Sequence, residues 1–302
     1  MRRFPVLLFI VISLVLSACQ PPVTPAPARP TPDTQPATPQ ATDPAATATQ
    51  AAPDCSAAEG EVRDLQITAR TNTENMQVKV YLPPCYGQND SAGYPALYLL
   101  HGQDADNHQW IDLGITRAAD TLIAAGQIPP LIIVLPGEQN PLQSPQDSSF
   151  GSEIIQSLLP YVDAHYSTCT ERACRAIGGL SRGGNWAVAL GFTHPGLFTA
   201  VGAHSTPLFY GQAAQIRQSV TEMNAPSDAP FLYVDVGDKD MYYANVAEFV
   251  STLEELGVPY QYTEFAGKHE PAYWSAHVSN YLLWYGEHLM NPEDPALPTP
   301  AP

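Results

Sequence analysis

The sequence contains a Gly-x-Ser-x-Gly motif centred on Ser181, with Gly179 and Gly183 as its glycines. The motif lies between an apolar segment typical of a buried strand, 173–178, and a segment with helical spacing, 185–193. In this setting the serine stands on a sharp turn that presents its hydroxyl above the carboxyl edge of a sheet. Larger side chains in place of the two glycines would collide in such a turn. Ser181 is therefore the candidate nucleophile for acyl-transfer chemistry.

A serine hydroxyl becomes nucleophilic when an imidazole accepts its proton and a carboxylate orients that imidazole. With the serine on such a turn, the usual chain order is serine, acid and then histidine. His269 fits the last place because it follows a predicted strand, 261–265, in a loop that contains Gly267. His277 and His288 fall in the next predicted helix and are interpreted as packing or surface residues. His269 is the candidate base.

The candidate acid lies in the loop after another predicted strand, 231–236. Asp238 and Asp240 both occur there and both qualify, although Asp240 lies farther out on the loop and has more reach toward a histidine in the next loop. Asp235 lies inside the strand and is interpreted as a structural residue. The residues alone leave Asp238 and Asp240 as alternatives, because a short loop carboxylate also caps turns.

An oxyanion that forms on the substrate needs two preorganised hydrogen-bond donors. The residue after the nucleophile supplies one backbone N–H, here that of Arg182. The second is expected from Gln103, which follows the predicted strand 96–100. Gly102 before it lets the backbone approach the substrate carbonyl. His101 in the same segment is interpreted as a residue that braces the loop.

The same loop contains Asp104, Asp106 and His108, which are residue types that bind metals. Their close spacing in one loop is weak evidence for a site. No cysteine pair has zinc-finger spacing either. We expect no metal and no cofactor.

Two kinds of strand pattern precede the serine motif. The segments 61–69 and 76–82 alternate apolar and polar residues, which predicts a pair of antiparallel strands. The runs 96–100 and 131–135 are apolar throughout, as in strands buried on both faces of a parallel sheet. Further strands are predicted at 173–178, 200–203, 231–236 and 261–265, separated by helices at 115–125, 152–166, 185–193, 211–223, 243–256 and 271–288. Alternating strands and helices predict an α/β fold with a mostly parallel sheet covered on both faces.

Several short motifs follow one another along the chain, and together they are far more specific than the serine motif alone. They are Tyr94-Pro95 before Leu99-Leu100-His101-Gly102 and Trp110, Leu159-Pro160-Tyr161-Val162 before Tyr166, the segment from Gly179 to Gly184, the segment from Leu253 to Val258, and Gly267-Lys268-His269-Glu270 with Trp274. Together they resemble the esterase D-like family, which includes S-formylglutathione hydrolases, feruloyl and acetyl xylan esterases, enterochelin esterases and mycolyl transferases. The resemblance implies an α/β-hydrolase fold and a serine esterase.

The resemblance also bears on single residues. Family members commonly show a glycine, two intervening residues and then the acid, which implies that Asp240 orients His269. Two positions depart from the family pattern. Gln103 stands where a glycine is frequent, which leaves the backbone donor in place and adds a side chain near the acyl pocket. Arg182 stands where many members have methionine.

The termini differ in composition from the rest of the chain. Residues 1–19 combine Arg2 and Arg3 with an apolar run that ends in Leu-Ser-Ala-Cys, which predicts a signal peptide. The last four of these residues resemble a bacterial lipobox, so Cys19 is the candidate lipidation site; an ordinary signal peptide is the alternative. Residues 20–53 are rich in Pro, Thr and Ala, which predicts an extended linker. The expected domain is 54–290, followed by a disordered tail, 291–302.

Charge and cysteines limit the partners and the compartment. The formal net charge is −17, and 26 acidic against 10 basic residues between 54 and 290 place most of it in the domain. Nucleic acid is therefore a poor partner. Besides Cys19 the chain has four cysteines, an even number in a chain expected to be exported. Four cysteines allow three pairings, and nearness in sequence favours Cys55 with Cys85 and Cys169 with Cys174.

The expected function is hydrolysis of carboxylic esters through an acyl-enzyme on Ser181. Acyl esters of carbohydrates are the leading substrate class, because the enzyme is expected to be anchored outside the cell through its N-terminal lipid and the resemblance includes such esterases. An acyltransferase of the same fold is one alternative. A catalytically silent, surface-binding lipoprotein is another.

Overall fold

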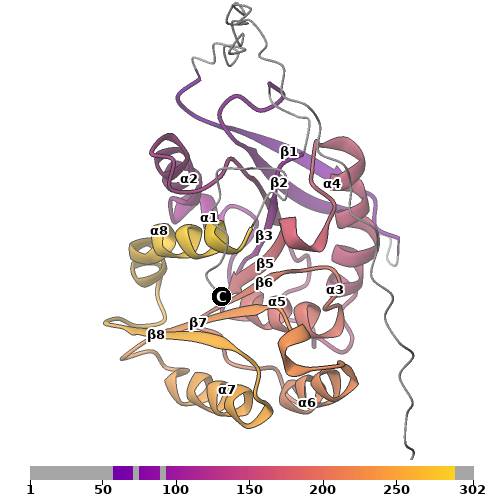
Figure 1. Ribbon diagram of the computed structural model, residues 1–302, viewed down its shortest axis with the longest axis vertical. Coiled ribbons are helices and arrows are strands. Elements are labelled where there is room, and N and C mark those ends of the chain that lie inside the picture. The colour runs from indigo at the N-terminus through magenta and orange to yellow at the C-terminus, as the bar shows by residue number, and fades with distance from the viewer. Residues whose placement is uncertain (1–56, 71–74, 89–92, 290–302) are drawn as a thin grey trace, which may run out of the picture. The chain divides into compact units, whose positions relative to one another are not determined.

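The computed structural model describes residues 57–70, 75–88 and 93–289. They form an eight-stranded sheet in the order β1-β2-β4-β3-β5-β6-β7-β8 (Figure 1). β1 pairs antiparallel with β2 and β2 with β4, whereas all other neighbours are parallel. The strands are β1 (Glu61–Ile67), β2 (Met76–Leu82), β3 (Ala96–Leu100), β4 (Ile132–Pro136), β5 (Arg175–Leu180), β6 (Ala200–His204), β7 (Phe231–Gly237) and β8 (Tyr260–Phe265).

Helices cover both faces of the sheet. One apolar core lies between the sheet and α3, η1, α4, α5, α6 and α7, and the second lies between the sheet and α1, α2 and α8. The helices are α1 (Gln109–Asp112), α2 (Ile115–Ala124), α3 (Phe150–Glu153), the π-helical η1 (Ile154–Leu158), α4 (Leu159–His165), α5 (Arg182–Thr193), α6 (Gln212–Glu222), α7 (Tyr243–Leu256) and α8 (Pro271–His288), with short 3₁₀ turns η2 (Arg172–Cys174) and η3 (Pro226–Asp228).

The central strands are buried on both faces, as their continuous apolar runs predict. Every residue of β3, β4, β5 and β6 is buried, whereas β1 at the edge is mostly exposed. A parallel sheet needs crossover connections that place helices on its faces, so its strands lose contact with water. The predicted α/β-hydrolase fold, with a mostly parallel sheet and helices on both faces, is confirmed.

Three predicted elements differ most in extent from the observed ones, and several others differ by one or two residues. The helix predicted over 152–166 is α3, η1 and α4 in succession. Pro160 lies at its middle, and a proline lacks the N–H that would bond four residues back, which accounts for the wider π turn there. β5 ends at Leu180, not 178, and α5 begins at Arg182, not 185. The turn around Ser181 is therefore tighter than predicted.

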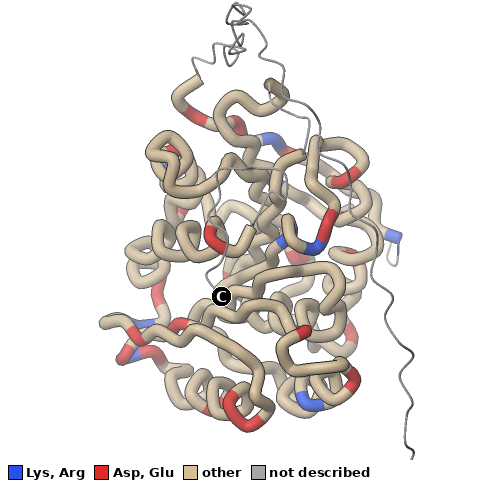
Figure 2. The backbone as a smooth tube through the Cα atoms, in the orientation of Figure 1, with Lys and Arg blue, Asp and Glu red and all other residues tan. Residues whose placement is uncertain are grey.

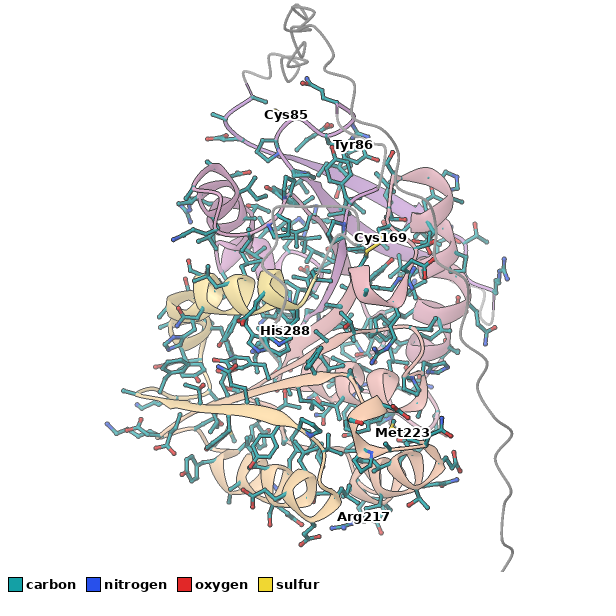
Figure 3. All side chains as sticks on the ribbon, in the orientation of Figure 1. Cys85, Tyr86, Cys169, Arg217, Met223 and His288 are labelled. Carbon is teal, nitrogen blue, oxygen red and sulfur yellow. A yellow bond between two sulfur atoms is a disulfide. The ribbon has the colours of Figure 1, made fainter. Side chains whose placement is uncertain are left out.

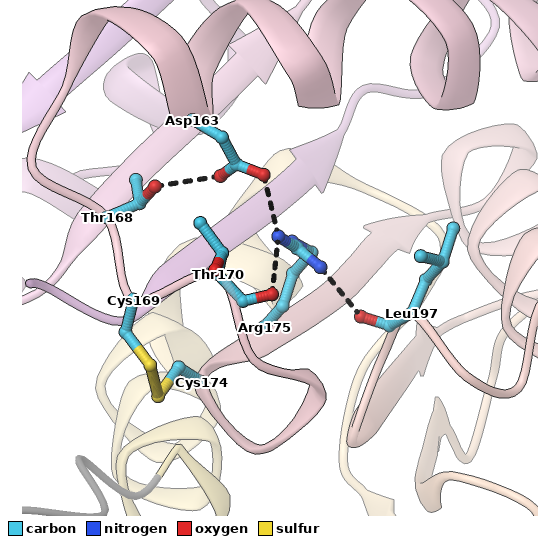
Figure 4. Close-up of a disulfide and its surroundings, with 7 residues drawn as sticks. All are labelled: Asp163, Thr168, Cys169, Thr170, Cys174, Arg175 and Leu197. Carbon is cyan, nitrogen blue, oxygen red and sulfur yellow. Dashed lines mark hydrogen bonds and ion pairs between the residues drawn. A yellow bond between two sulfur atoms is a disulfide. The ribbon is translucent and has the colours of Figure 1, made fainter.

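The disulfides are partly within the described residues. Cys169 and Cys174 form a disulfide with their Cα atoms 5.7 Å apart (Figures 3 and 4). Cys85 is also disulfide-bonded. Its predicted partner, Cys55, lies outside the described residues, so that pairing stays a prediction. Beside the first disulfide, Arg175 bonds Asp163 of α4 at 2.9 Å and joins the start of β5 to that helix (Figure 4).

The predictions for the termini also fall outside the described residues. These are the signal peptide and Cys19, the linker 20–53 and the tail 291–302. Within the described ranges, no helix combines the length and apolar content that crossing a bilayer requires.

Acidic residues lie on many elements, with few Lys and Arg among them (Figure 2).

Candidate active site

Ser181 occupies the sharp turn between β5 and α5. Its backbone has φ 52° and ψ −118°, a conformation that non-glycine residues rarely adopt. Hydrogen bonds hold the turn, because the Ser181 N–H donates to the carbonyl of His204 on the neighbouring strand at 2.9 Å and the Ser181 carbonyl accepts from Asn185 at 3.1 Å. Backbone strain of this kind persists where the surrounding structure enforces it. The turn presents the serine Oγ at the carboxyl edge of the sheet.

The two glycines of the motif are needed for close packing. A Cβ on Gly179 would meet the backbone of Gly183, and a Cβ on Gly183 would meet the backbone of Leu100 in β3. Backbone atoms cannot move aside as a flexible side chain can. The collision predicted from the motif is therefore a property of this turn.

His269 lies within hydrogen-bonding distance of the serine. It follows β8, and its Nε2 is 3.0 Å from Ser181 Oγ although 88 residues separate the two. Two rings meet the imidazole edge to face, Tyr242 at 4.8 Å and Trp274 at 4.9 Å between ring centres. The ring is thus held from two sides, with one nitrogen directed at the hydroxyl.

Asp240 lies on the other side of the imidazole. Its Oδ2 is 3.0 Å from His269 Nδ1, and its side chain is fully buried. Because a carboxylate only accepts, Nδ1 carries the proton and Nε2 is free to accept the Ser181 hydroxyl proton. Burial opposes the charge of Asp240, but hydrogen bonds from His269 and from the Tyr242 N–H (2.8 Å) outweigh it, and the pKa of Asp240 lies below its ordinary value.

Asp238 has a different partner. Its Oδ1 accepts the N–H of Gly267 at 2.9 Å, and the neighbouring Lys239 N–H donates to the Gly267 carbonyl at 2.9 Å. These bonds join the loop after β7 to the loop after β8. Gly237 permits the close approach, because a Cβ there would meet the backbone of Gly267. Asp238 therefore holds together the loops that carry Asp240 and His269.

The two expected oxyanion donors also lie at this edge. Arg182 is the first residue of α5, and the first N–H groups of a helix have no partner inside the helix. Gln103 follows β3, and both residues line the same cavity as Ser181 and His269. Gly102 is fixed beside them because its N–H donates to the Gln109 side chain at 2.7 Å.

Glu138 was not predicted from the sequence, and it is buried against Arg182, the residue that follows the serine. It follows β4, and its carboxylate bonds the Arg182 guanidinium at 2.6 and 2.7 Å. The Trp186 indole N–H donates to the same carboxylate at 3.1 Å. The available signal was an acidic residue two positions after an apolar parallel strand, at the sheet edge where the other site residues gather.

Another histidine and acid form a pair away from the serine. His204 Nδ1 lies 2.6 Å from Asp235 Oδ1, and both side chains are fully buried. Asp235 also accepts the hydroxyl groups of Tyr273 (2.6 Å) and Tyr281 (3.0 Å), and His204 Nε2 is 3.1 Å from the hydroxyl of Tyr285. The network fixes α8 against β6 and β7, which agrees with a structural role for Asp235.

The cavity in front of Ser181 has a volume of about 860 Å³. Aromatic and apolar side chains line much of its wall, and two of them, Tyr210 (97% exposed) and Met241 (75% exposed), reach into solvent. Asp106, in the loop that also contains Asp104 and His108, accepts the N–H of His108 at 2.8 Å. Among the described residues, no three His, Cys, Asp or Glu side chains lie close enough to hold a metal ion.

Solved structures share this fold. A ferulic acid esterase matches with a TM-score of 0.69 and 25% identity, over 77% of this chain and 99% of that one. The feruloyl esterase module from Clostridium thermocellum, in complex with sinapinate, also matches with a TM-score of 0.69, at 20% identity over 80% of this chain and 92% of that one.

Curated relatives match over shorter segments. An endo-1,4-beta-xylanase/feruloyl esterase of Xylanibacter ruminicola is 27% identical over 191 residues, which are 60% of this chain and 25% of that protein. An esterase of Mycobacterium tuberculosis is 34% identical over 142 residues, which are 44% of this chain and 29% of that protein. The chain thus spans about a quarter of the length of these relatives.

The family described as "Putative esterase" matches residues 69–285, which include every residue of the site described above. This match covers more than half of the chain and agrees with the resemblance of its motifs to esterase D-like proteins. The protein belongs to this esterase family of the α/β-hydrolase fold.

Proposed function

We propose that the protein is a serine hydrolase that cleaves carboxylic esters through an acyl-enzyme on Ser181. The observation that carries the proposal is one continuous chain of hydrogen bonds, from Asp240 through His269 to Ser181, which opens into a cavity. A nucleophile, a base oriented by a third group, and backbone donors beside them are the parts that acyl transfer requires.

In the proposed reaction, Ser181 Oγ attacks the ester carbonyl carbon while its proton passes to His269 Nε2. The carbonyl oxygen becomes an oxyanion that accepts the N–H groups of Gln103 and Arg182. Collapse of this intermediate breaks the bond to the alcohol, which leaves with the proton from His269. Water then attacks the acyl-enzyme with His269 as base, which releases the acid and restores Ser181. Asp240 stays ionised and stabilises the imidazolium.

Acyl esters of carbohydrates are the proposed substrate class. Relatives named feruloyl esterases support this choice, as does the exposed pair of Tyr210 and Met241 at the cavity. Flat or apolar side chains that protrude from a cavity can pack against an aromatic acyl group or a sugar ring. The lipid anchor predicted at Cys19 would hold the domain at the outer surface of the cell membrane, where polymeric carbohydrate is accessible.

A substrate panel tests the proposal. It contains p-nitrophenyl acetate, butyrate and octanoate, methyl ferulate, a feruloylated arabinose oligosaccharide and an acetylated xylose oligosaccharide. We expect the highest kcat/KM with a sugar-linked ester. Turnover of p-nitrophenyl esters alone would contradict the carbohydrate assignment and leave the serine esterase intact. Adding a sugar acceptor and measuring ester product separates hydrolysis from acyl transfer.

A further inference from the structure

The Arg182–Glu138 ion pair is buried next to the nucleophile. The arginine side chain is 7% exposed and the glutamate 2% exposed. Besides its two bonds to the carboxylate, the guanidinium donates to the carbonyl of Gln143 at 2.9 Å, and it lies over the rings of Trp186 and Phe209. The Arg182 side chain is therefore held by the loop after β4, while its backbone N–H is the first oxyanion donor.

Glu138 also reaches the second donor, through its backbone. Its N–H donates to Nε2 of His101 at 2.8 Å. Because this N–H can only donate, Nε2 accepts and the proton of the neutral imidazole is on Nδ1. Nδ1 lies 2.7 Å from the carbonyl oxygen of Gly102 and donates to it. His101 is thus fixed in one tautomer and holds the Gly102 carbonyl.

The bond to Gly102 determines the direction of the Gln103 N–H. The Gly102 carbonyl and the Gln103 N–H belong to one peptide unit, and in a planar trans peptide they point in opposite directions. Holding the carbonyl toward His101 directs the N–H away from His101, and Gln103 itself lines the cavity in front of Ser181. One residue therefore connects to both donors, by its side chain to Arg182 and by its backbone to Gln103.

We propose that Glu138 is the positioning residue of the oxyanion hole: its ion pair with Arg182 fixes one backbone donor, and its backbone N–H fixes the other through His101. This inference rests on the proposed esterase function. Glu138 touches neither the substrate nor the nucleophile, so its effect passes through Arg182 and His101. Hydrogen-bond donors of this kind act on the transition state, and losing one typically lowers kcat by about 10²- to 10³-fold.

The first test is Glu138→Gln. The carboxylate accepts from Arg182 and Trp186, so a glutamine NH₂ in its place faces donors and leaves part of a buried guanidinium unpaired. We expect kcat to fall about 10- to 100-fold with KM almost unchanged. The reason is that the backbone hydrogen bonds to the oxyanion, which the variant weakens, form only in the transition state. A trifluoromethyl ketone, which places an oxyanion in the same position, should lose affinity by the same factor.

A second variant separates positioning from folding. Glu138→Leu combined with Arg182→Met removes both charges, and replacing a buried pair with apolar residues is often neutral for stability. We expect the melting temperature to return to near the wild-type value while kcat stays at least 10-fold low. Recovery of kcat together with stability would overturn the proposal, and a rise in KM alone would instead indicate substrate binding by Arg182.

Asp163→Asn is the matched control. It breaks the ion pair with Arg175, and this pair is also largely buried. Arg175 begins β5, whereas Ser181 follows the end of that strand, so the two residues are roughly 20 Å apart at about 3.3 Å per residue. We expect lower stability and unchanged kcat. Ser181→Ala is measured in parallel. If Ser181→Ala retains activity, the proposed esterase function is wrong. If Ser181→Ala is inactive but Glu138→Gln keeps the full kcat, only the role of Glu138 is refuted.

Discussion

Asp240 Oδ2 lies 3.0 Å from His269 Nδ1, although 29 residues separate the two along the chain. The contact depends on the bonds that join the loop after β7 to the loop after β8, including Asp238 to Gly267 and Lys239 to Gly267. Two aspartates in one short loop therefore have separate partners. One orients the imidazole, and the other holds the loop that carries it.

Asp240→Asn should lower turnover about 10⁴-fold with the fold intact. An asparagine keeps the shape of the side chain but can stabilise the wrong histidine tautomer, which has this effect in a well-studied protease. The measurement is kcat on a p-nitrophenyl ester, with circular dichroism to verify folding.

Asp238→Asn is the control for that variant. The amide oxygen of asparagine can still accept the Gly267 N–H, so we expect turnover within a few-fold of wild type and a small loss of stability. A crippled Asp238→Asn beside an active Asp240→Asn would reverse the roles of the two acids.

The sheet and the serine turn were predictable from the sequence because their causes are local. Continuous apolar runs predicted the buried strands, and the glycines around Ser181 predicted a turn that only small residues permit. Chain order and loop position were enough to select His269. In each case neighbouring residues determine the structure.

Contacts between distant loops were beyond the sequence. Choosing Asp240 over Asp238 rested on a family resemblance, since greater reach favoured Asp240 but either residue could instead cap a turn or a helix. Glu138 was missed because its partners, Arg182 and His101, are 44 and 37 residues away. A carboxylate after a strand is ordinarily solvated, and nothing nearby in sequence shows that this one is buried.

Stability should depend on pH through His101. Burial lowers the pKa of His101, although the Gly102 carbonyl, Glu138 and Asp106 favour its protonated form and Arg182 opposes it. Protonation of the His101 imidazole is thus less favourable in the folded protein than in the unfolded chain, where this histidine takes up a proton below a pH of about 6.5. The free energy of unfolding should fall as the pH falls through and below that value.

The check is urea unfolding at pH 7.5, 6.5 and 5.5 for wild type and His101→Asn. The variant should be less stable at every pH, but its stability should decline less steeply with acid, because the titrating group is gone. Equal slopes for the two proteins would show that His101 does not carry this dependence.

The Cys169–Cys174 disulfide should contribute modestly to stability. The cysteines are five residues apart, and the chain-entropy model gives about 2 kcal/mol for so short a loop. Replacing both with alanine should lower the free energy of unfolding by no more than this.

Peptide mapping tests the pairing of the cysteines. Arg172 lies between Cys169 and Cys174, so trypsin digestion without reductant should yield two peptides joined by the disulfide. The same digest tests whether Cys55 pairs with Cys85. Free thiols at these positions would refute the pairing.

Cys19→Ala should release the protein from the membrane fraction or mislocalise it. Each buried CH₂ of an attached acyl chain adds about 0.8 kcal/mol of membrane affinity, and two chains give stable anchoring. Fractionation of cells that express each form, with intact-mass measurement of the mature protein, provides the test. A processed variant that remains in the membrane would contradict lipidation at Cys19.

Fluorophosphonate labelling tests the central claim, that Ser181 is the nucleophile activated by His269, most directly. The purified protein is treated with the probe, the site is mapped by peptide mass spectrometry, and ester hydrolysis is measured at each extent of labelling. We predict one adduct, on Ser181, with activity lost in proportion. We also predict that Ser181→Ala and His269→Ala lose about 10⁴- to 10⁶-fold in kcat, with folding retained. An adduct on another residue, or turnover near wild type in either variant, would contradict the claim.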